Sequence, residues 1–202
     1  MHFEVKFHVA DQTFNPQFGE VHNISDGGFE RGYAEGYEDG NKSAKQIVVG
    51  IADRSITEFE TPDGMTAFGA YAFCDCSKLT KLTIGDSVTS IGNFVFQRCT
   101  RLKDVSFGNN IASIGSGAFT NCSSIKNIVL PINLKNVYGL AFSNCTGLES
   151  VVFRSKPNSV TATAFSGCTN LRNIYVPWAE GEFGSEPWGA TNATIHYNCG
   201  TD

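Results

Sequence analysis

The feature that most constrains this chain is a repeat of 23 residues that occurs five times in succession without an insertion. Each repeat has a Phe, a Cys three places later and a series of apolar residues at fixed spacing after the Cys. The Phe residues are Phe73, Phe96, Phe119, Phe142 and Phe165, and the Cys residues are Cys76, Cys99, Cys122, Cys145 and Cys168. A short fixed period is typical of solenoids, in which each repeat forms one coil that packs against the next.

The apolar residues that follow each Cys predict one short strand per coil. In the first repeat they are Leu79, Leu82 and Ile84, and their spacing alternates at its end as a strand does. One coil offers roughly eight inward apolar side chains, worth about 1.5–3 kcal/mol each when buried, against an ordering cost of about 1.5 kcal/mol per residue. A coil is therefore stable only beside its neighbours, and strands stacked coil on coil should form a parallel sheet.

The full pattern, A-F-x-x-C-x-x-L-x-x-V-x-F, resembles the bacterial surface-antigen (BspA-like) class of leucine-rich repeats. The strict pattern covers about half of the chain. The resemblance implies a β-rich solenoid, built as a right-handed leucine-rich repeat coil with a parallel sheet on its concave face. It also implies a binding or adhesion role on an extracellular surface.

The repeats are expected to be closed by a cap at each end. Phe59, Met65 and Phe68 keep the apolar spacing of a coil, although the Phe and Cys of the repeat are missing one period upstream of Phe73 and Cys76. An end coil cannot expose a bare apolar face, so a degenerate repeat is suited to that place. We therefore expect a solenoid over residues 51–202, with an N-terminal cap repeat at 51–72, regular repeats at 73–177 and a C-terminal cap at 178–202.

The segment before the solenoid has two parts. Residues 2–9 alternate charged or histidine side chains with apolar ones, which predicts a strand within an attachment arm of residues 1–27. Glycine then recurs every four residues, with an aromatic residue after each of the first three glycines, which favours either a helix in an oligomeric contact or a flexible linker over residues 28–50. The expected contact residues are Gly28, Gly32, Tyr33, Gly36, Tyr37 and Gly40.

Residue types that carry chemistry are sparse. The seven Cys residues are an odd number, and five of them form the repeat column, so we expect small buried free thiols there. Cys74 and Cys76 form C-x-C without a second pair or a nearby His, which does not predict a zinc site. No spacing typical of a catalytic triad or a phosphate-binding loop is present. The sequence therefore predicts a protein that is not an enzyme and has no cofactor.

The candidate binding surface is the outer face of the predicted strands. Residues between the inward columns should point away from the core and form a ribbon suited to a protein or a cell-surface glycan. An ordinary solvated strand face is the alternative. The two outward columns are Lys81, Asp104, Asn127, Ser150 and Asn173, and Thr83, Ser106, Val129, Val152 and Tyr175.

The net charge of −5 argues against a nucleic-acid partner, which requires clustered Lys and Arg. The longest apolar run, residues 47–52, is far too short to span a membrane, and the first residues lack the apolar core of a secretory signal. We therefore expect no membrane partner.

Two functions fit these features, and we expect the first, with the second as the alternative, because a particle released by lysis needs no secretory signal. One is a virion-associated protein of a phage or prophage (tail, fibre or capsid decoration), whose arm binds the particle or sister subunits in a homo-oligomer. The segments Tyr175–Trp178 and Pro187–Tyr197 are similar to endings of prophage repeat proteins. The other is a bacterial cell-surface adhesin or interaction module. The expected location is a virion or an extracellular surface, with the cytoplasm as the alternative.

Overall fold

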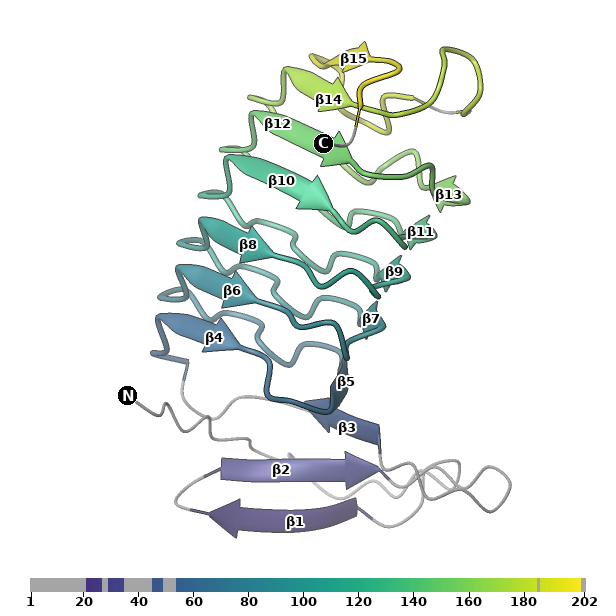
Figure 1. Ribbon diagram of the computed structural model, residues 1–202. Coiled ribbons are helices and arrows are strands. Elements are labelled where there is room, and N and C mark those ends of the chain that lie inside the picture. Colours follow the sequence, from purple (N-terminus) through teal and green to yellow (C-terminus); the bar gives the residue numbers. More distant parts are fainter. Residues whose placement is uncertain (1–20, 27–28, 35–44, 49–53, 185, 201–202) are drawn as a thin grey trace, which may run out of the picture.

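The computed structural model describes residues 21–26, 29–34, 45–48, 54–184 and 186–200. These residues form a β-solenoid in which one coil lies on the next from β4 to β15 (Figure 1). The fold class predicted from the repeat is therefore confirmed. The strand predicted for residues 2–9 lies outside the described ranges.

The long strands stack in register on one side of the solenoid. Lys81 pairs with Asp104, and Leu82 with Val105, so each residue lies beside the residue one period further along the chain. These strands form two parallel sheets rather than one continuous sheet. The first contains β4 (Glu58–Glu60), β6 (Lys81–Thr83) and β8 (Asp104–Ser106), and the second contains β10 (Asn127–Leu130), β12 (Ser150–Phe153), β14 (Asn173–Tyr175) and β15 (Thr194–His196).

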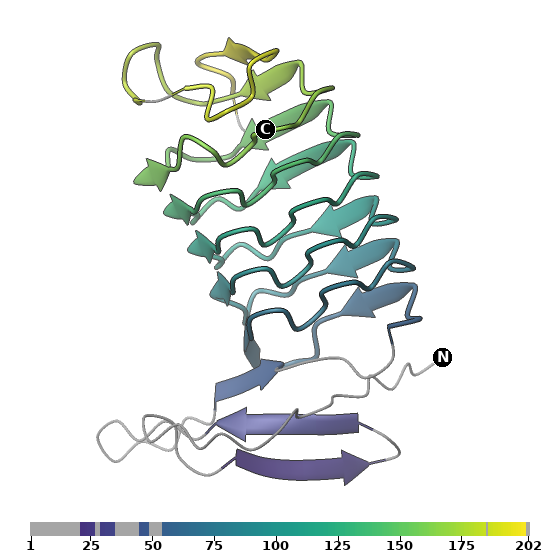
Figure 2. The same cartoon turned by 180° about the vertical axis from the view of Figure 1, so that it is seen from behind.

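A second side of the solenoid carries shorter parallel strands, which Figure 2 shows from behind. Most of them are two residues long, too short for an alternating pattern to reveal them in the sequence. They are β5 (Met65–Phe68), β7 (Ser90–Ile91), β9 (Ser113–Ile114), β11 (Asn136–Val137) and β13 (Ser159–Val160).

The described part of the N-terminal segment extends the sheet that the short strands form. β1 (Val21–Asp26) and β2 (Phe29–Ala34) pair in antiparallel fashion, β2 pairs with β3 (Lys45–Val48), and β3 pairs with β5 of the first coil. The helix predicted between residues 28 and 50 is therefore wrong at 29–34 and 45–48. Interior glycine disfavours a helix, whereas Phe29 and Tyr33 favour a strand that has a partner on each side.

Of the residues in the expected oligomeric contact, Gly32 and Tyr33 lie in β2. The other predicted contact residues lie outside the described ranges: Gly28, Gly36, Tyr37 and Gly40.

The repeated Phe residues form the centre of the core. Phe96, Phe119, Phe142 and Phe165 are fully buried, and their rings stack nearly parallel with centroids 5.1, 5.2 and 5.4 Å apart. This spacing is close to the separation of paired strands, so ring stacking and backbone pairing favour the same distance between coils. The core predicted from the repeat is confirmed.

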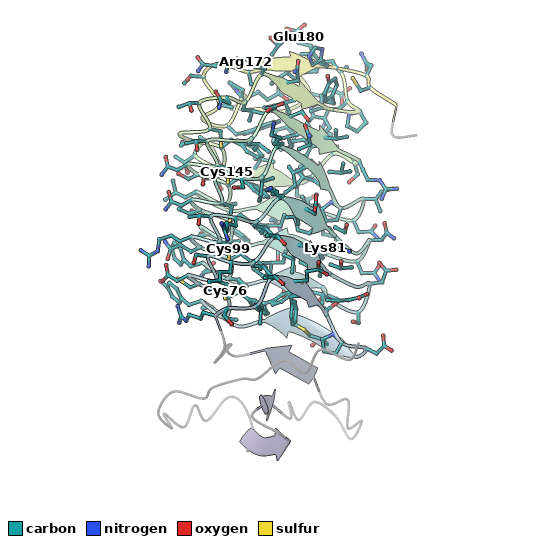
Figure 3. All side chains as sticks on the ribbon, turned by 90° about the vertical axis from the view of Figure 1, so that its left-hand side faces the viewer. Cys76, Lys81, Cys99, Cys145, Arg172 and Glu180 are labelled. Carbon is teal, nitrogen blue, oxygen red and sulfur yellow. The ribbon has the colours of Figure 1, made fainter. Side chains whose placement is uncertain are left out.

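The Cys column is a second internal ladder, and Figure 3 labels Cys76, Cys99 and Cys145 within it. Each thiol from Cys99 onward donates a hydrogen bond to the carbonyl of the Phe 26 positions earlier, with distances of 3.0–3.2 Å. All seven Cys are free, and the five of the column are buried, as predicted for them. Burial raises the pKa of Cys76 to about 12, so this thiol stays protonated.

Both caps cover the open ends with aromatic side chains. At the first coil Phe59 is buried with its ring centroid 4.5 Å from that of Phe73. At the last coil Trp178 and Trp188 are buried beside Phe153. β15 pairs with β14 although Ile195 lies 21 residues after Ile174 instead of 23, which explains why the period is not visible there.

The long-strand side is interrupted between β8 and β10. Val105 and Phe107 are half-buried there, whereas the equivalent residues of the next coil, Ile128 and Leu130, are buried. The interruption coincides with a change in the residue that follows the strand. A Cβ at Gly108 would clash with the carbonyl of Gly85, so these two coils, which have glycine after the long strand, lie very close together. Pro131 holds this position in the next coil, where its ring prevents an equally close approach.

The thiol hydrogen bonds can be tested by Cys122→Ala. This substitution removes the bond to the Phe96 carbonyl and leaves a small cavity, so we expect the free energy of unfolding to fall by about 1–2 kcal/mol in urea denaturation. Cys199→Ala is the matched control, because Cys199 is only half-buried, and should change stability by less than about 0.5 kcal/mol. Equal stability of the two variants would contradict a role for the column.

Candidate functional site

The structure places all ten predicted binding residues on the long-strand side. Pairing in register aligns each outward column, and Figure 3 shows Lys81 on this side. The interruption between β8 and β10 divides the set. Lys81, Thr83, Asp104 and Ser106 lie on the first sheet, and Asn127, Val129, Ser150, Val152, Asn173 and Tyr175 lie on the second.

The two parts differ in charge. The first sheet is charged, since Glu58 lies beside Lys81 in one outward column and Glu60 lies beside Thr83 in the other. The second sheet presents no charged side chain in the two outward columns, which Thr194 and His196 extend onto β15. We call this second set the neutral face; its residues are Asn127, Val129, Ser150, Val152, Asn173, Tyr175, Thr194 and His196.

Polar contacts along the neutral face hold its side chains in place. Ser150 Oγ donates to Asn127 Oδ1 at 2.7 Å, and His196 Nε2 lies 2.9 Å from Asn173 Oδ1. The rings of Tyr175 and His196 stack with centroids 4.7 Å apart and an interplanar angle of 17°. Such mutual support lowers the entropy that each side chain loses on contact with a ligand.

Apolar area lies beside this polar network. Val129 is 50% exposed, and Val152 and Tyr175 continue the same column in the next two coils. Aromatic side chains with an apolar body and a polar tip are common anchors in recognition surfaces. The neutral face thus combines an apolar column with fixed amide, hydroxyl and imidazole groups.

The sequence analysis left out the part of this face that lies on β15, Thr194 and His196, because the 23-residue step is lost before it. The signal that would have revealed it is the alternation Thr194–Ile195–His196, which repeats the outward–inward–outward pattern of Asn173–Ile174–Tyr175.

The C-terminal cap holds β15 in position through one carboxylate. Glu186 accepts a hydrogen bond from Trp178 Nε1 at 3.0 Å and another from Tyr197 Oη at 2.6 Å. The bond to Glu186 raises the pKa of Tyr197 to about 12. Because Tyr197 follows His196 directly, this contact also steadies the Tyr175–His196 pair.

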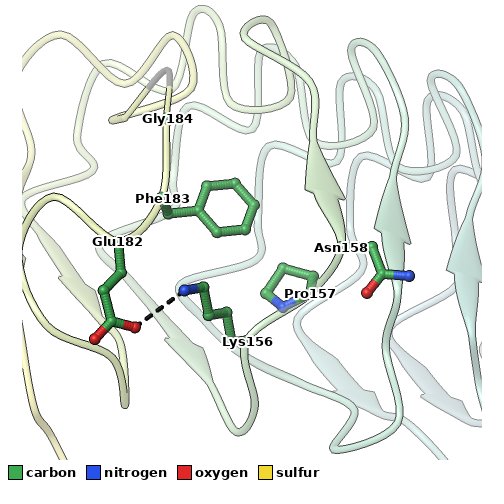
Figure 4. A pocket seen from close by; sticks show the side chains of 6 residues that line it. All are labelled: Lys156, Pro157, Asn158, Glu182, Phe183 and Gly184. Carbon is green, nitrogen blue, oxygen red and sulfur yellow. Dashed lines mark hydrogen bonds and ion pairs between the residues drawn. The ribbon is translucent and has the colours of Figure 1, made fainter.

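A separate hollow of about 430 Å³ lies beside the cap. Lys156 Nζ and Glu182 form an ion pair at 3.0 Å across its rim, and Phe183 and Pro157 supply apolar wall (Figure 4). Within the described ranges no three His, Cys, Asp or Glu side chains are grouped as metal ligands. The hollow is shallow and its charges are paired, so it offers less to a ligand than the neutral face.

Residues 52–178 match the family model of the BspA type leucine rich repeat region, with six copies of the repeat. The chain belongs to this family. The match extends from the first coil to the last strand before the C-terminal cap.

Solved structures with the same fold include bacterial leucine-rich repeat proteins. A leucine rich cell surface protein from Faecalibacterium prausnitzii is 28% identical with a TM-score of 0.64, over 71% of this chain and 37% of that one. The T. pallidum leucine rich repeat protein is 26% identical with a TM-score of 0.62, over 84% and 80% of the two chains. The pneumococcal vaccine antigen PcpA, at 24% identity and a TM-score of 0.59, shares the fold over 66% of this chain and 36% of its own.

This family member thus spans little more than a third of the Faecalibacterium prausnitzii protein. A search of curated proteins finds no match. Among the described residues, no helix has the length and apolar character needed to cross a membrane.

The Glu186–Tyr197 contact predicts one late tyrosine ionisation. A folded-state pKa above the ordinary value means that the contact stabilises the cap fully below about pH 10 and is lost as pH rises towards 12. Absorbance titration at alkaline pH should show a step near pH 12 that Tyr197→Phe removes. The control Tyr138→Phe, which alters an exposed ring, should leave that step in place, and its persistence in Tyr197→Phe would contradict the assignment.

Proposed function

We propose that this chain is a non-enzymatic recognition module of a bacterial surface protein that binds a protein or a cell-surface glycan through its neutral face. The observation that carries the proposal is the outward column of Val129, which is exposed, and Val152 and Tyr175, which are half-buried, flanked by fixed polar groups. The match to the BspA-type family and the likeness to a bacterial cell surface protein support the surface location.

A rigid platform suits this role. Each strand of the neutral face is backed by the fully buried residues Ile128, Val151 and Ile174, so the outward side chains stand on a packed core. Ligand groups can therefore bind without reordering the backbone, which lowers the entropic cost of association. A face without charged columns favours partners whose contact region is also uncharged, such as a neutral glycan or the apolar part of a protein surface.

The side chains that could carry out chemistry support the proposal that the protein is not an enzyme. Burial raises the pKa of Cys76 and Cys122, so these thiols stay protonated, and Cys122 donates to the Phe96 carbonyl. The His on the neutral face is stacked and hydrogen-bonded, and the Lys and Glu of the hollow are paired with each other. These groups are engaged in structure and are not placed around a common reacting atom.

A virion component remains the second candidate. It is favoured by the likeness of the segments Tyr175–Trp178 and Pro187–Tyr197 to endings of prophage repeat proteins. In that case the N-terminal arm would bind the particle and the same neutral face would bind the host surface. Genes for tail or capsid proteins beside this one would favour this candidate, and genes for surface anchoring would oppose it.

Binding through the neutral face can be tested with a glycan array and a random-peptide phage library as probes. We expect Val129→Asp and Tyr175→Ala each to lower the affinity for selected binders at least tenfold, because both remove apolar contact area at the centre of the face. Leu140→Asp is the matched control, since Leu140 is also an exposed apolar residue but lies on another side of the solenoid. Binders whose affinity falls for Leu140→Asp but stays the same for the other two variants would contradict the proposal.

A further inference from the structure

Exposed basic side chains gather at the turns that lead into the long strands of three successive coils. These turns form the left-hand edge of the solenoid in Figure 1, and Figure 3 shows this edge facing the viewer. The turns, residues 77–80, 100–103 and 123–126, contain four basic residues and no Asp or Glu, in a chain whose net charge is −5. We call these residues the basic patch; they are Lys78, Arg101, Lys103 and Lys126, and all four are exposed. The patch ends at Lys126, which forms an ion pair with Glu149 at 3.2 Å.

Coil stacking brings these cations together although the sequence separates them. Lys78 and Arg101 occupy the same position of the repeat, three residues before the paired strands β6 and β8. Lys103 N donates to Thr80 O at 2.9 Å, which joins the second turn to the first. Ser124 Oγ donates to a carbonyl of the second turn at 2.7 Å, which joins the third turn to the second. The basic patch therefore continues from coil to coil along the edge of the solenoid.

The charges at the centre of the basic patch are not balanced within the described part of the chain. Elsewhere the step of one coil pairs opposite charges, as in the contact of Arg98 with Asp75 at 2.6 Å. In the patch the same step places Lys78 beside Arg101, which is a pair of like charges. Within the described ranges no ion pair joins Lys78, Arg101 or Lys103 to a carboxylate.

The fold does not require basic residues at these positions. Ser124 holds the position of Lys78 and Arg101 in the next coil, and Thr80 holds the position of Lys103 in the previous coil. Like charges on neighbouring strands lower stability. Basic side chains that oppose stability and have no partner in the coil stack indicate an anion that binds from outside.

We propose that the basic patch binds a sulfated polysaccharide, whose sulfate groups contact Lys78, Arg101 and Lys103. A guanidinium group can donate two parallel hydrogen bonds to an oxyanion, and a Lys ammonium binds it as a point charge. Neighbouring strands lie about 4.8 Å apart, which is less than the screening length of about 8 Å at physiological salt, so cations of successive coils act on the same polyanion. The exposed hydroxyl groups of Ser77 and Thr100 lie in the same turns and suit the hydroxyl groups of a sugar.

The side chains of the turns favour a sugar polymer over a protein or a single-stranded nucleic acid. The apolar residues of the three turns, Leu79, Leu102 and Ile125, are fully buried, and the others are Ser, Thr, Lys and Arg. These turns thus lack an exposed ring on which a base stacks and an apolar centre of the kind that protein interfaces contain. A hydrated partner that offers anions and hydroxyl groups matches them better.

Acidic residues border the basic patch and restrict the path of a polyanion. The outward columns of the first sheet carry Glu58, Glu60 and Asp104, with Lys81 as the one cation among their six residues. This negative face repels a polyanion, so the ligand is kept along the turns. A double helix is broad enough to contact both regions, whereas one polysaccharide chain follows the turns alone.

Heparin, a sulfated glycan, is a suitable probe of the basic patch in isothermal titration calorimetry with the full chain. We expect binding that weakens as the salt concentration rises, because the contacts are ionic and exposed. The double substitution Lys78→Ser with Arg101→Ser should lower the affinity at least tenfold, and serine fits there because Ser124 holds the same position. Lys135→Ser is the matched control, since it removes an exposed Lys beside β11 on the short-strand side, and should change the affinity less than twofold.

Several results of this titration would overturn the proposal. They are the absence of heparin binding, an equal loss of affinity in Lys135→Ser and in the double variant, and equal binding of chemically desulfated heparin. Tighter binding of double-stranded DNA than of heparin would assign the basic patch to nucleic acid instead. Urea denaturation should show the double variant to be no less stable than the parent chain, and a marked loss of stability would give the cations a structural role.

The basic patch and the neutral face are separate sites, so the two proposals can fail independently. Tyr175→Ala should leave the affinity for heparin within twofold, and the double variant of the basic patch should keep the affinity for the binders selected on the neutral face. Heparin binding that is lost in Tyr175→Ala and kept in the double variant would overturn the assignment to the basic patch.

Discussion

Stacking of the repeated Phe rings is the interaction on which the rest of the structure depends. The rings from Phe96 to Phe165 lie 5.1–5.4 Å apart, close to the separation of paired parallel strands. Because one coil cannot bury its own flanks, each ring is covered only when the next coil presents its own ring at the same place. The 23-residue period, the buried thiols and the outward columns follow from this requirement.

The same stacking decides where recognition can occur. Inward positions are restricted to side chains that fit between neighbouring coils, but outward positions of the long strands and of the turns can vary without affecting the core. The chain uses this freedom twice. One set of outward residues forms the neutral face around Tyr175, and another exposes Tyr71 beside Phe94 in the turns that follow the short strands. The neutral face is built by repetition, since each of four successive strands contributes two of its residues.

Much of the fold and part of the site could be predicted from the sequence for the same reason. The Phe and Cys columns have one allowed spacing, so the buried core and the outward positions from Lys81 to Tyr175 follow from counting. The strand Phe29–Ala34 could not be predicted. Glycine every four residues suggests a helix, and the pairing with Lys45–Val48 that favours a strand cannot be read from the local pattern. Thr194 and His196 were missed because a shortened coil interrupts the period before them.

The most direct test of the stacking account is the removal of one whole period. Deletion of residues 143–165 removes 23 residues and joins Phe142 to Ser166, which keeps every later coil in register. We predict that this chain still unfolds in one cooperative urea transition, with a smaller m-value that reflects the lost surface. Deletion of residues 143–164, one residue fewer, should abolish that transition because the inward side chains after the junction are displaced. Equal folding of the two chains would contradict the account.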